Sequence, residues 1–177
     1  MRAPKKHKSL PQSFFKRETT SVARDLLGNI LVYGNYQGFI IETEAYRGLD
    51  DEASHAFKGA TPRAAIMFGP PGLSYVYLIY GIYSCFNVVT EPDGSPGAVL
   101  IRGIQLISPH PSRLEGPGKL TRTLGITRKD NGRDLTADPT FYIKEGRSVA
   151  NFETTSRIGI QKAQEKLWRF VAPVLKL

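Results

Sequence analysis

Cysteine and histidine are scarce in this chain, which holds one Cys and three His among its 177 residues. The lone thiol of Cys85 excludes a disulfide within the chain, and His7, His55 and His110 lack the close spacing of metal ligands. A phosphate-binding lysine loop and a glycine-rich nucleotide fingerprint are also absent. We therefore expect no metal and no cofactor.

Long apolar runs are absent as well. No stretch approaches the roughly 20 residues that cross a bilayer, and no apolar signal core follows the basic residues near the N-terminus. Hydrophobic residues still make up 41% of the chain, enough at this length for the core of one ordinary domain. We expect a soluble, intracellular protein that is not secreted and has no membrane partner.

Acidic residues are the minority charge, with 16 Asp and Glu against 24 Lys and Arg and a formal net charge of +8. Residues 1–30 carry about +5 and residues 101–177 about +7, whereas residues 42–52 carry about −4. A basic surface attracts nucleic-acid phosphates, although mere solubility explains it equally well. The acidic segment is either a solvated loop or a set of carboxylates held near a reacting group.

The pattern of apolar residues predicts a single α+β domain. One helix is capped by Thr20 or a neighbour and stops at Gly28, and a second covers residues 119–124 and stops at Gly125. Turn residues and β-branched runs predict strands at residues 30–33, 38–46, 74–90, 98–104, 141–143 and 168–171.

Two segments fall outside this regular pattern. Residues 1–12 are basic and aperiodic, which predicts a flexible arm before a domain over residues 13–177. Residues 47–73 are polar and rich in Gly and Pro. Because connections of this length inside a compact domain are often functional, we expect residues 47–73 to form a wall of a site.

The carboxylates of the acidic segment are the first candidate for chemistry. Strand alternation places Glu42, Glu44 and Tyr46 on one face, where a carboxylate beside an aromatic ring can serve as a general base. The alternative is a solvent-facing strand edge, since acidic side chains on strands are usually exposed. His55 can donate a hydrogen bond in the same site or be a structural side chain.

Aromatic residues are the second candidate. Residues 74–90 hold Tyr75, Tyr77, Tyr80 and Tyr83, and Gly81 predicts a tight turn that puts Tyr80 at an exposed hairpin tip. Exposed rings stack on bases or wedge between base pairs, whereas buried ones merely fill a β core.

Two further polar features stand out. Asn87 lies in an apolar strand, so its amide either satisfies the backbone or reads the edge of a ligand. The glycine-rich residues 116–118, followed by Lys119, predict a helix start whose amides can meet a phosphate.

With these motifs in order, the chain resembles the alkyladenine (3-methyladenine) DNA glycosylases from about residue 13 to residue 170. With this resemblance we expect a single α+β domain. It is built on a mixed, mostly antiparallel curved β-sheet, with short flanking helices and a protruding β-hairpin. The matching segments are residues 42–46, 51–55, 61–63, 67–68, 75–77, 80–81, 87, 100–102, 116–120, 131–132, 134–135 and 157–160.

The resemblance implies a monofunctional glycosylase that flips an alkylated or deaminated purine out of double-stranded DNA and hydrolyses its N-glycosidic bond. Such an enzyme leaves an abasic site and needs no lysine Schiff base. By similarity of position, Glu44 is expected to activate the water, Arg102 to help hold it, and Tyr80 to intercalate.

The remaining positions are carried over in the same way. Tyr46, Tyr77 and His55 are similar to the pocket walls around the flipped base, and Asn87 to the residue that disfavours guanine. Arg63 and Lys119 are candidates for contact with the DNA backbone.

The resemblance also has limits and rivals. Residues 64–66, Leu167 and Val171 depart from the family pattern, which leaves the substrate range open. A non-catalytic damaged-DNA-binding module and a carbohydrate hydrolase are the alternatives, and the basic charge counts against the second. The short N-terminus favours a bacterial type of protein, for which a cytoplasmic, nucleoid-associated monomer is expected.

Overall fold

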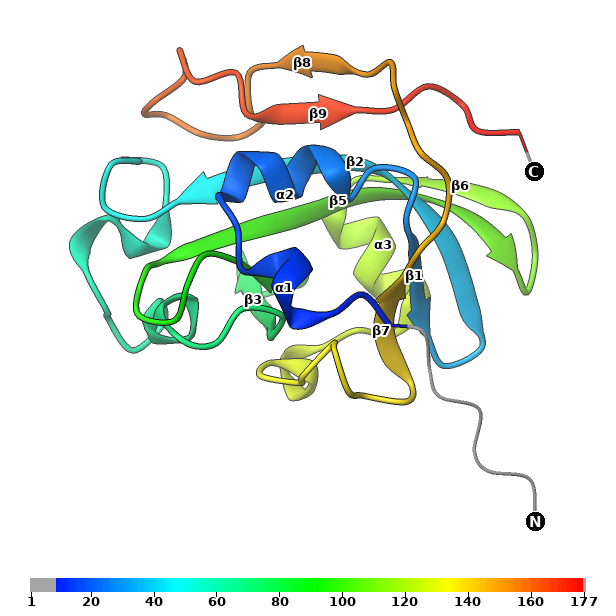
Figure 1. The fold of residues 1–177 in the computed structure, drawn as a ribbon, viewed down its shortest axis with the longest axis horizontal. Coiled ribbons are helices and arrows are strands. Elements are labelled where there is room, and N and C mark those ends of the chain that lie inside the picture. Colours follow the sequence, from blue (N-terminus) through cyan, green and yellow to red (C-terminus); the bar gives the residue numbers. More distant parts are fainter. Residues whose placement is uncertain (1–8, 177) are drawn as a thin grey trace.

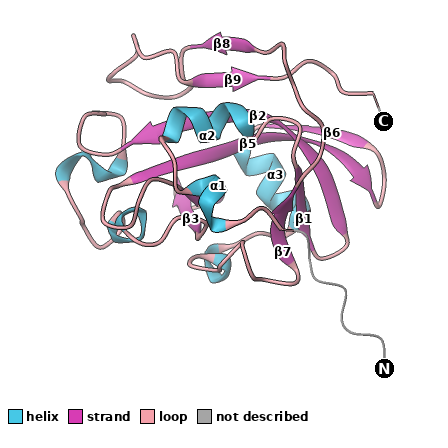
Figure 2. Ribbon diagram, in the orientation of Figure 1, coloured by secondary structure: helices cyan, strands magenta, loops and turns pink. Residues whose placement is uncertain are grey.

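The computed structural model describes residues 9–176, which form one strongly curved β-sheet with a few short helices against it (Figures 1 and 2). The strands are β1 (Ile30–Tyr33), β2 (Tyr36–Arg47), β3 (Ser74–Ile79), β4 (Tyr83–Val89), β5 (Gly97–Ser108), β6 (Ser112–Glu115), β7 (Phe141–Lys144), β8 (Glu153–Thr155) and β9 (Arg169–Val171).

The helices are short, and three single turns accompany them. The α-helices are α1 (Gln12–Phe15), α2 (Thr19–Asp25) and α3 (Pro117–Leu124), and the 3-10 turns are η1 (His55–Lys58), η2 (Ala65–Phe68) and η3 (Arg128–Asp130).

The sheet has the order β3-β4-β5-β2-β1-β7, with β6 added to β5 and the β8–β9 pair added to β2. Every strand pair of the described residues is antiparallel. The expected mixed sheet is therefore wrong in that one respect. Hairpins join β1 to β2, β3 to β4 and β5 to β6, and each makes its two strands antiparallel. The predicted α+β class is confirmed.

The N-terminal part of the domain begins earlier than the sequence indicates. Leu10 is buried and its amide donates to the carbonyl of Ile143, while the Ser9 hydroxyl donates to Thr136 O. The arm predicted over residues 1–12 therefore overlaps the fold in its last four residues. Its other residues, 1–8, lie outside the described residues.

Helix α2 begins at Thr19 and is capped by Glu18, two residues before Thr20, which the sequence offered as the cap. The Glu18 carboxylate accepts hydrogen bonds from the amides of Thr20 and Ser21 at 3.1 and 2.9 Å. The helix is followed, as predicted, by Gly28, whose φ of +83° suits glycine.

One face of β3, β4 and β5 builds the main core. Val76, Phe86, Val99 and Ile101 alternate along these strands, are buried, and pack with apolar residues of α2 and α3. The opposite face therefore stays available for other uses.

That opposite face carries a row of paired residues across five strands. Tyr75 on β3 pairs with Asn87 on β4, Asn87 with Leu100 on β5, Leu100 with Glu44 on β2, and Glu44 with Arg169 on β9. Directly paired residues project from the same side of a sheet. The fold thus brings together side chains that lie far apart in the sequence.

Strand β2 is covered on both edges where its carboxylates lie. Its register against β5 shifts around Glu42, and β9 pairs with residues 42–44 on the other edge. A bulge of this kind bends a strand and increases its twist. Glu44 is 0% exposed, so the alternative of a solvent-facing strand edge is wrong.

No helix of the described residues is long and apolar enough to cross a membrane.

We expect Phe86→Ala to lower the free energy of unfolding by about 3–5 kcal/mol, because the substitution empties a fully buried site. The Phe86 ring centroid lies 4.9 Å from that of Phe141, so a core contact is lost as well. Urea unfolding measures the change. The matched control is Ile82→Ala, at a side chain that is 73% exposed, where a change within about 0.5 kcal/mol is expected.

Candidate active site

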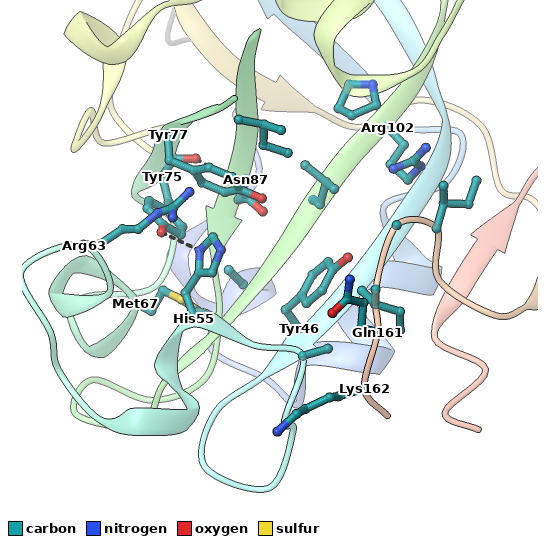
Figure 3. Close-up of a pocket in the computed structure, with 18 of the residues that line it drawn as sticks. Tyr46, His55, Arg63, Met67, Tyr75, Tyr77, Asn87, Arg102, Gln161 and Lys162 are labelled. Carbon is teal, nitrogen blue, oxygen red and sulfur yellow. Dashed lines mark hydrogen bonds between the residues drawn. The ribbon is translucent and has the colours of Figure 1, made fainter. Parts of the chain in front are cut away.

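A cavity of about 540 Å³ lies over the face of the sheet that the main core leaves free (Figure 3). Strands β2 to β5 form its floor, and loops from residues 52–67 and 158–162 form its sides. The long connection predicted as a site wall is therefore confirmed in that position. The cavity is lined by seven of the residues that the sequence singled out: Tyr46, His55, Arg63, Tyr77, Tyr80, Asn87 and Arg102.

Glu44 does not itself line this cavity, but three of its neighbours do: Tyr46, Arg102 and Ile158. Its Oε2 accepts a hydrogen bond from the Tyr46 hydroxyl at 2.6 Å, and its Oε1 accepts one from the amide of Ile158 at 2.7 Å. Arg102 Nε lies 3.6 Å from the same Oε1. The predicted pair of Glu44 and Arg102 is thus brought together.

Burial raises the pKa of Glu44 above its ordinary value. The Arg102 charge and the hydrogen bonds from Tyr46 and Ile158 lower this pKa and so oppose the rise, while the charge of Glu42 adds to it. Because burial is the largest contribution, the carboxylate has a stronger affinity for a proton than an exposed one.

Glu42 occupies a different environment on the same strand face. Its Oε1 accepts from Arg102 Nε at 3.0 Å and from Arg169 Nε at 2.6 Å. Strand alternation could not distinguish the two carboxylates, but the structure separates them. Glu42 is held between two guanidiniums, whereas Glu44 accepts hydrogen bonds from the Tyr46 hydroxyl and the Ile158 amide.

Three aromatic rings in contact with one another form one wall of the cavity, with His55 edge-on to Tyr77 and Tyr75 tilted against Tyr77. The ring centroids of His55 and Tyr77 are 4.7 Å apart, and those of Tyr75 and Tyr77 are 5.1 Å apart. Nδ1 of His55 is 2.9 Å from the hydroxyl of Tyr75. Figure 3 shows His55 and Tyr77 on one side of the cavity and Tyr46 on the other, which leaves a space for a flat ring between them.

Asn87 is buried in β4 and borders the cavity. Its Nδ2 donates to the carbonyl of Tyr75 at 3.1 Å, so the amide satisfies the backbone of the neighbouring strand. This bond also fixes how the side chain faces the cavity. Of the two alternatives left open by the sequence, satisfaction of the backbone is confirmed, and reading of a ligand edge stays a prediction.

Tyr80 stands at the tip of the β3–β4 hairpin, as Gly81 predicted. Its side chain is 89% exposed and its φ is +52°, a left-handed conformation that is rare for a residue with a side chain. Ile82 and Tyr83 beside it are also exposed. The exposed position is confirmed, and intercalation stays a prediction.

The two expected backbone-contacting residues lie in different places. The Arg63 guanidinium sits 4.8 Å from the centroid of the Tyr77 ring and donates to the carbonyl of Leu78, so it is part of the cavity rim. Lys119 is exposed in the first turn of α3 and lies outside the cavity lining. Both reach solvent, and neither contact with DNA is tested.

The segment at residues 156–168 is the part of the site that sequence reasoning missed. Ile158 supplies an amide to Glu44, and Gln161 and Lys162 line the cavity beside Tyr46 (Figure 3). The segment has no regular structure and no apolar periodicity. The only signal was the segment 157–160, which resembled a family motif without a role attached.

Asp51 also escaped assignment to a role. Its carboxylate and the Arg157 guanidinium form an ion pair with two contacts at 2.6 and 2.8 Å, and both side chains are 0% exposed. Of the two explanations for the acidic segment, the solvated loop fails for Asp51.

Clusters of metal-binding side chains are not found within residues 9–176: no three His, Cys, Asp or Glu side chains gather there. Cys85 is buried in β4 on the same face as its directly paired residue Tyr77, and burial raises the pKa of its thiol to about 11.

Comparison with known proteins agrees with this geometry. The family model for methylpurine-DNA glycosylase matches residues 13–174. The chain belongs to the methylpurine-DNA glycosylase family. Membership makes the protein a hydrolase of N-glycosyl bonds and a DNA repair enzyme, and it removes the carbohydrate hydrolase from the alternatives.

Bacterial relatives match over most of their length, and each is named "Putative 3-methyladenine DNA glycosylase". The protein of Ehrlichia ruminantium is 51% identical over 168 residues, which cover 93% of this chain and 89% of the relative. A Wolbachia protein, from the endosymbiont of Brugia malayi, is 52% identical over 161 residues, or 91% and 95% of the two chains. The Ehrlichia chaffeensis protein is 49% identical and covers 96% of both chains.

Residues 64–66, Leu167 and Val171 depart from the family pattern, and they lie at different places relative to the cavity. Ala64 is buried in a small apolar cluster with Met67 and Tyr75, both of which line the cavity, and Ile66 packs against that cluster. Leu167 and Val171 do not line it. Only residues 64–66 are therefore placed to change its shape.

We expect the His55 ring to protonate at about pH 4. Burial, helped by the Arg63 charge, lowers the pKa of His55 to about 4 from its ordinary 6.5. The unfolded chain takes up this proton at about pH 6.5, so the residue's contribution to stability is lost as the pH falls from there towards 4. An NMR titration of the imidazole protons, assigned with His55→Asn, measures the midpoint, and a midpoint near 6.5 contradicts the prediction.

Proposed function

We propose that this glycosylase flips an alkylated or deaminated purine out of double-stranded DNA and hydrolyses its N-glycosidic bond. The substrate class is 3-methyladenine, hypoxanthine and ethenoadenine, and the product is an abasic site. One observation carries the proposal: the buried carboxylate of Glu44 lies beside an aromatic cavity, met by Tyr46, Ile158 and Arg102.

The flipped base occupies the cavity between aromatic side chains. Tyr46 covers one side of the purine, and His55 with Tyr77 covers the other, which replaces the stacking lost in the duplex. His55 is neutral near pH 7 because its pKa is lowered to about 4, so it can both donate and accept a hydrogen bond. Asn87 faces the purine edge and disfavours guanine.

The hydrolysis uses Glu44 as its general base. A water oxygen bonds to the sugar C1′ as the bond from C1′ to the purine nitrogen breaks, and the bonding electrons leave with the purine. Glu44 accepts the proton of the water and its negative charge stabilises the oxocarbenium-like centre. Arg102 holds both the carboxylate and the water.

A direct displacement by water fits the cavity better than a lysine adduct. The lysine that lines the cavity is Lys162, whose side chain is exposed and lies 3.5 Å from Glu52. A nucleophilic lysine is usually desolvated so that its amine loses its proton. The enzyme is therefore proposed to be monofunctional.

The DNA duplex is held by the basic surface and opened at the hairpin tip. Tyr80 enters the stack in place of the flipped nucleotide, while Arg63 and Lys119 contact the backbone. The enzyme is proposed to act as a monomer, because it encloses one flipped nucleotide at a time.

Glu44→Gln is expected to lower single-turnover base release by about 10²–10⁴-fold with DNA binding unchanged, because the amide cannot accept the proton. Release is measured on duplexes with one hypoxanthine or ethenoadenine and on methylated DNA, with alkali to reveal abasic sites. Glu42→Gln on the same strand face is the control and is expected to lose less activity.

The outcomes separate the proposal from its rivals. Binding without release by the parent on every lesion would establish a damage-binding module, and full activity in the Glu44 variant would move the general base elsewhere.

Tyr80→Ala is expected to weaken binding to lesion-bearing duplex by about 5- to 150-fold, since a stacked ring contributes about 1–3 kcal/mol. Fluorescence anisotropy measures the affinity. Tyr80→Phe keeps the ring and is expected to bind like the parent, so equal losses in both variants would contradict a wedge made by the ring.

A further inference from the structure

The buried ion pair of Asp51 and Arg157 joins residues 106 positions apart in the sequence. Both side chains are 0% exposed, and two parallel contacts of 2.6 and 2.8 Å make the pair bidentate. Nε of Arg157 has no hydrogen-bond partner. A buried pair with an unsatisfied atom contributes little stability beyond what apolar residues would give, so stability alone does not explain it.

Arg157 also contacts the strand that carries Glu44. Its Nη1 donates to the carbonyl of Ala45 at 2.9 Å, and its guanidinium lies 4.8 Å from the centroid of the Tyr46 ring and 5.2 Å from that of Trp168. Ala45 stands between Glu44 and Tyr46 in the chain. One side chain therefore ties β2, the loop of Asp51 and the end of the segment 156–168 together.

The segment 156–168 is held at its far end by two hydrogen bonds, from the Ala45 amide to Trp168 O and from Lys166 Nζ to the carbonyl of Asp50, and near Glu44 by Arg157. It forms no helix or strand, and Arg157 is its one buried residue. The next residue, Ile158, has an exposed side chain, yet its amide donates to Glu44 Oε1 at 2.7 Å. An exposed loop residue can keep such a bond only if its backbone is held by a neighbour.

We propose that Arg157, through its pair with Asp51, is a positioning residue that holds the Ile158 amide on the Glu44 carboxylate. This inference rests on the proposed function, in which Glu44 is the general base. Arg157 itself touches neither the substrate nor the water.

The groups that face Glu44 determine what the loss of this amide does. Glu42 and Tyr46 face it from β2, Arg102 from β5, Arg169 from β9, Cys85 from β4 and Ile158 from the segment 156–168. The Ile158 amide favours the ionised carboxylate, and Asp51 balances the charge of Arg157. If the amide moves away, the pKa of Glu44 rises further, and a base that must be ionised then needs a higher pH.

The test is the pH dependence of single-turnover base release. Arg157→Lys keeps the charge but lacks the bidentate fork, and Asp51→Asn loosens the pair from its other end. Ile158→Pro removes the N–H itself, whereas Ile158→Ala keeps it and removes only the side chain. The matched control is Arg133→Lys, which alters a bidentate pair with Asp138 outside the cavity lining.

We expect the acid limb of the profile to move up by about 1 pH unit in Arg157→Lys and Ile158→Pro, with the activity recovering at high pH. The Arg157→Lys/Ile158→Pro double variant should shift no further than either single variant, because both act through one hydrogen bond. Ile158→Ala and Arg133→Lys should leave the limb in place, even where they lower the melting temperature.

The outcomes are distinguishable. A uniform loss of activity at every pH in Arg157→Lys, or an additive shift in the double variant, would overturn the positioning role. If Arg157→Lys does not fold, the pH profile of Asp51→Asn takes its place: a shifted acid limb supports the positioning role, and a uniform loss of activity overturns it. No base release by the parent would instead count against the proposed function, before any variant is compared.

Discussion

The burial of one ionisable carboxylate in the middle of a sheet constrains the rest of this structure. Glu44 lies on β2 between β5 and β9, and its side chain is 0% exposed to bulk water. An unpaired charge in such a place would cost several kcal/mol. Tyr46, Ile158 and Arg102 supply the contacts instead. The C-terminal segment is therefore as necessary to the site as the strand that carries the carboxylate.

The two faces of the sheet have different roles: one forms the hydrophobic core and the other forms the cavity. One face is apolar, packs against α2 and α3 and carries the main hydrophobic core. The other holds rings, an amide and charges around a cavity, and it packs only a small apolar cluster beneath Met67. Residues 64–66 stand at this second cluster, so a change there alters the cavity without disturbing the main core.

Local patterns predicted much of this fold and part of its site. Alternation and Gly81 were sufficient for β2, for the β3–β4 hairpin and for the exposed place of Tyr80. The sequence could not show that β9 covers the other edge of β2, because alternation identifies a face but not what lies over it. For the same reason it could not separate Glu44 from Glu42. Elements of three or four residues, such as α1, β6 and β8, are too short to leave a periodic signal.

The β3–β4 hairpin sets a fixed spacing between the exposed ring of Tyr80 and the wall of the cavity. Tyr75, Tyr77 and Asn87 belong to the same two paired strands whose tip is Tyr80, so the cavity wall and the exposed ring move as one piece. A strand rises about 3.3 Å per residue, close to the distance between stacked bases. On the proposed function, the hairpin fixes the distance between the gap in the base stack, which Tyr80 fills, and the cavity that receives the flipped purine. On the same proposal, a base that rotates only part of the way would leave Tyr80 between the base pairs without reaching the cavity, and would return to the duplex uncut.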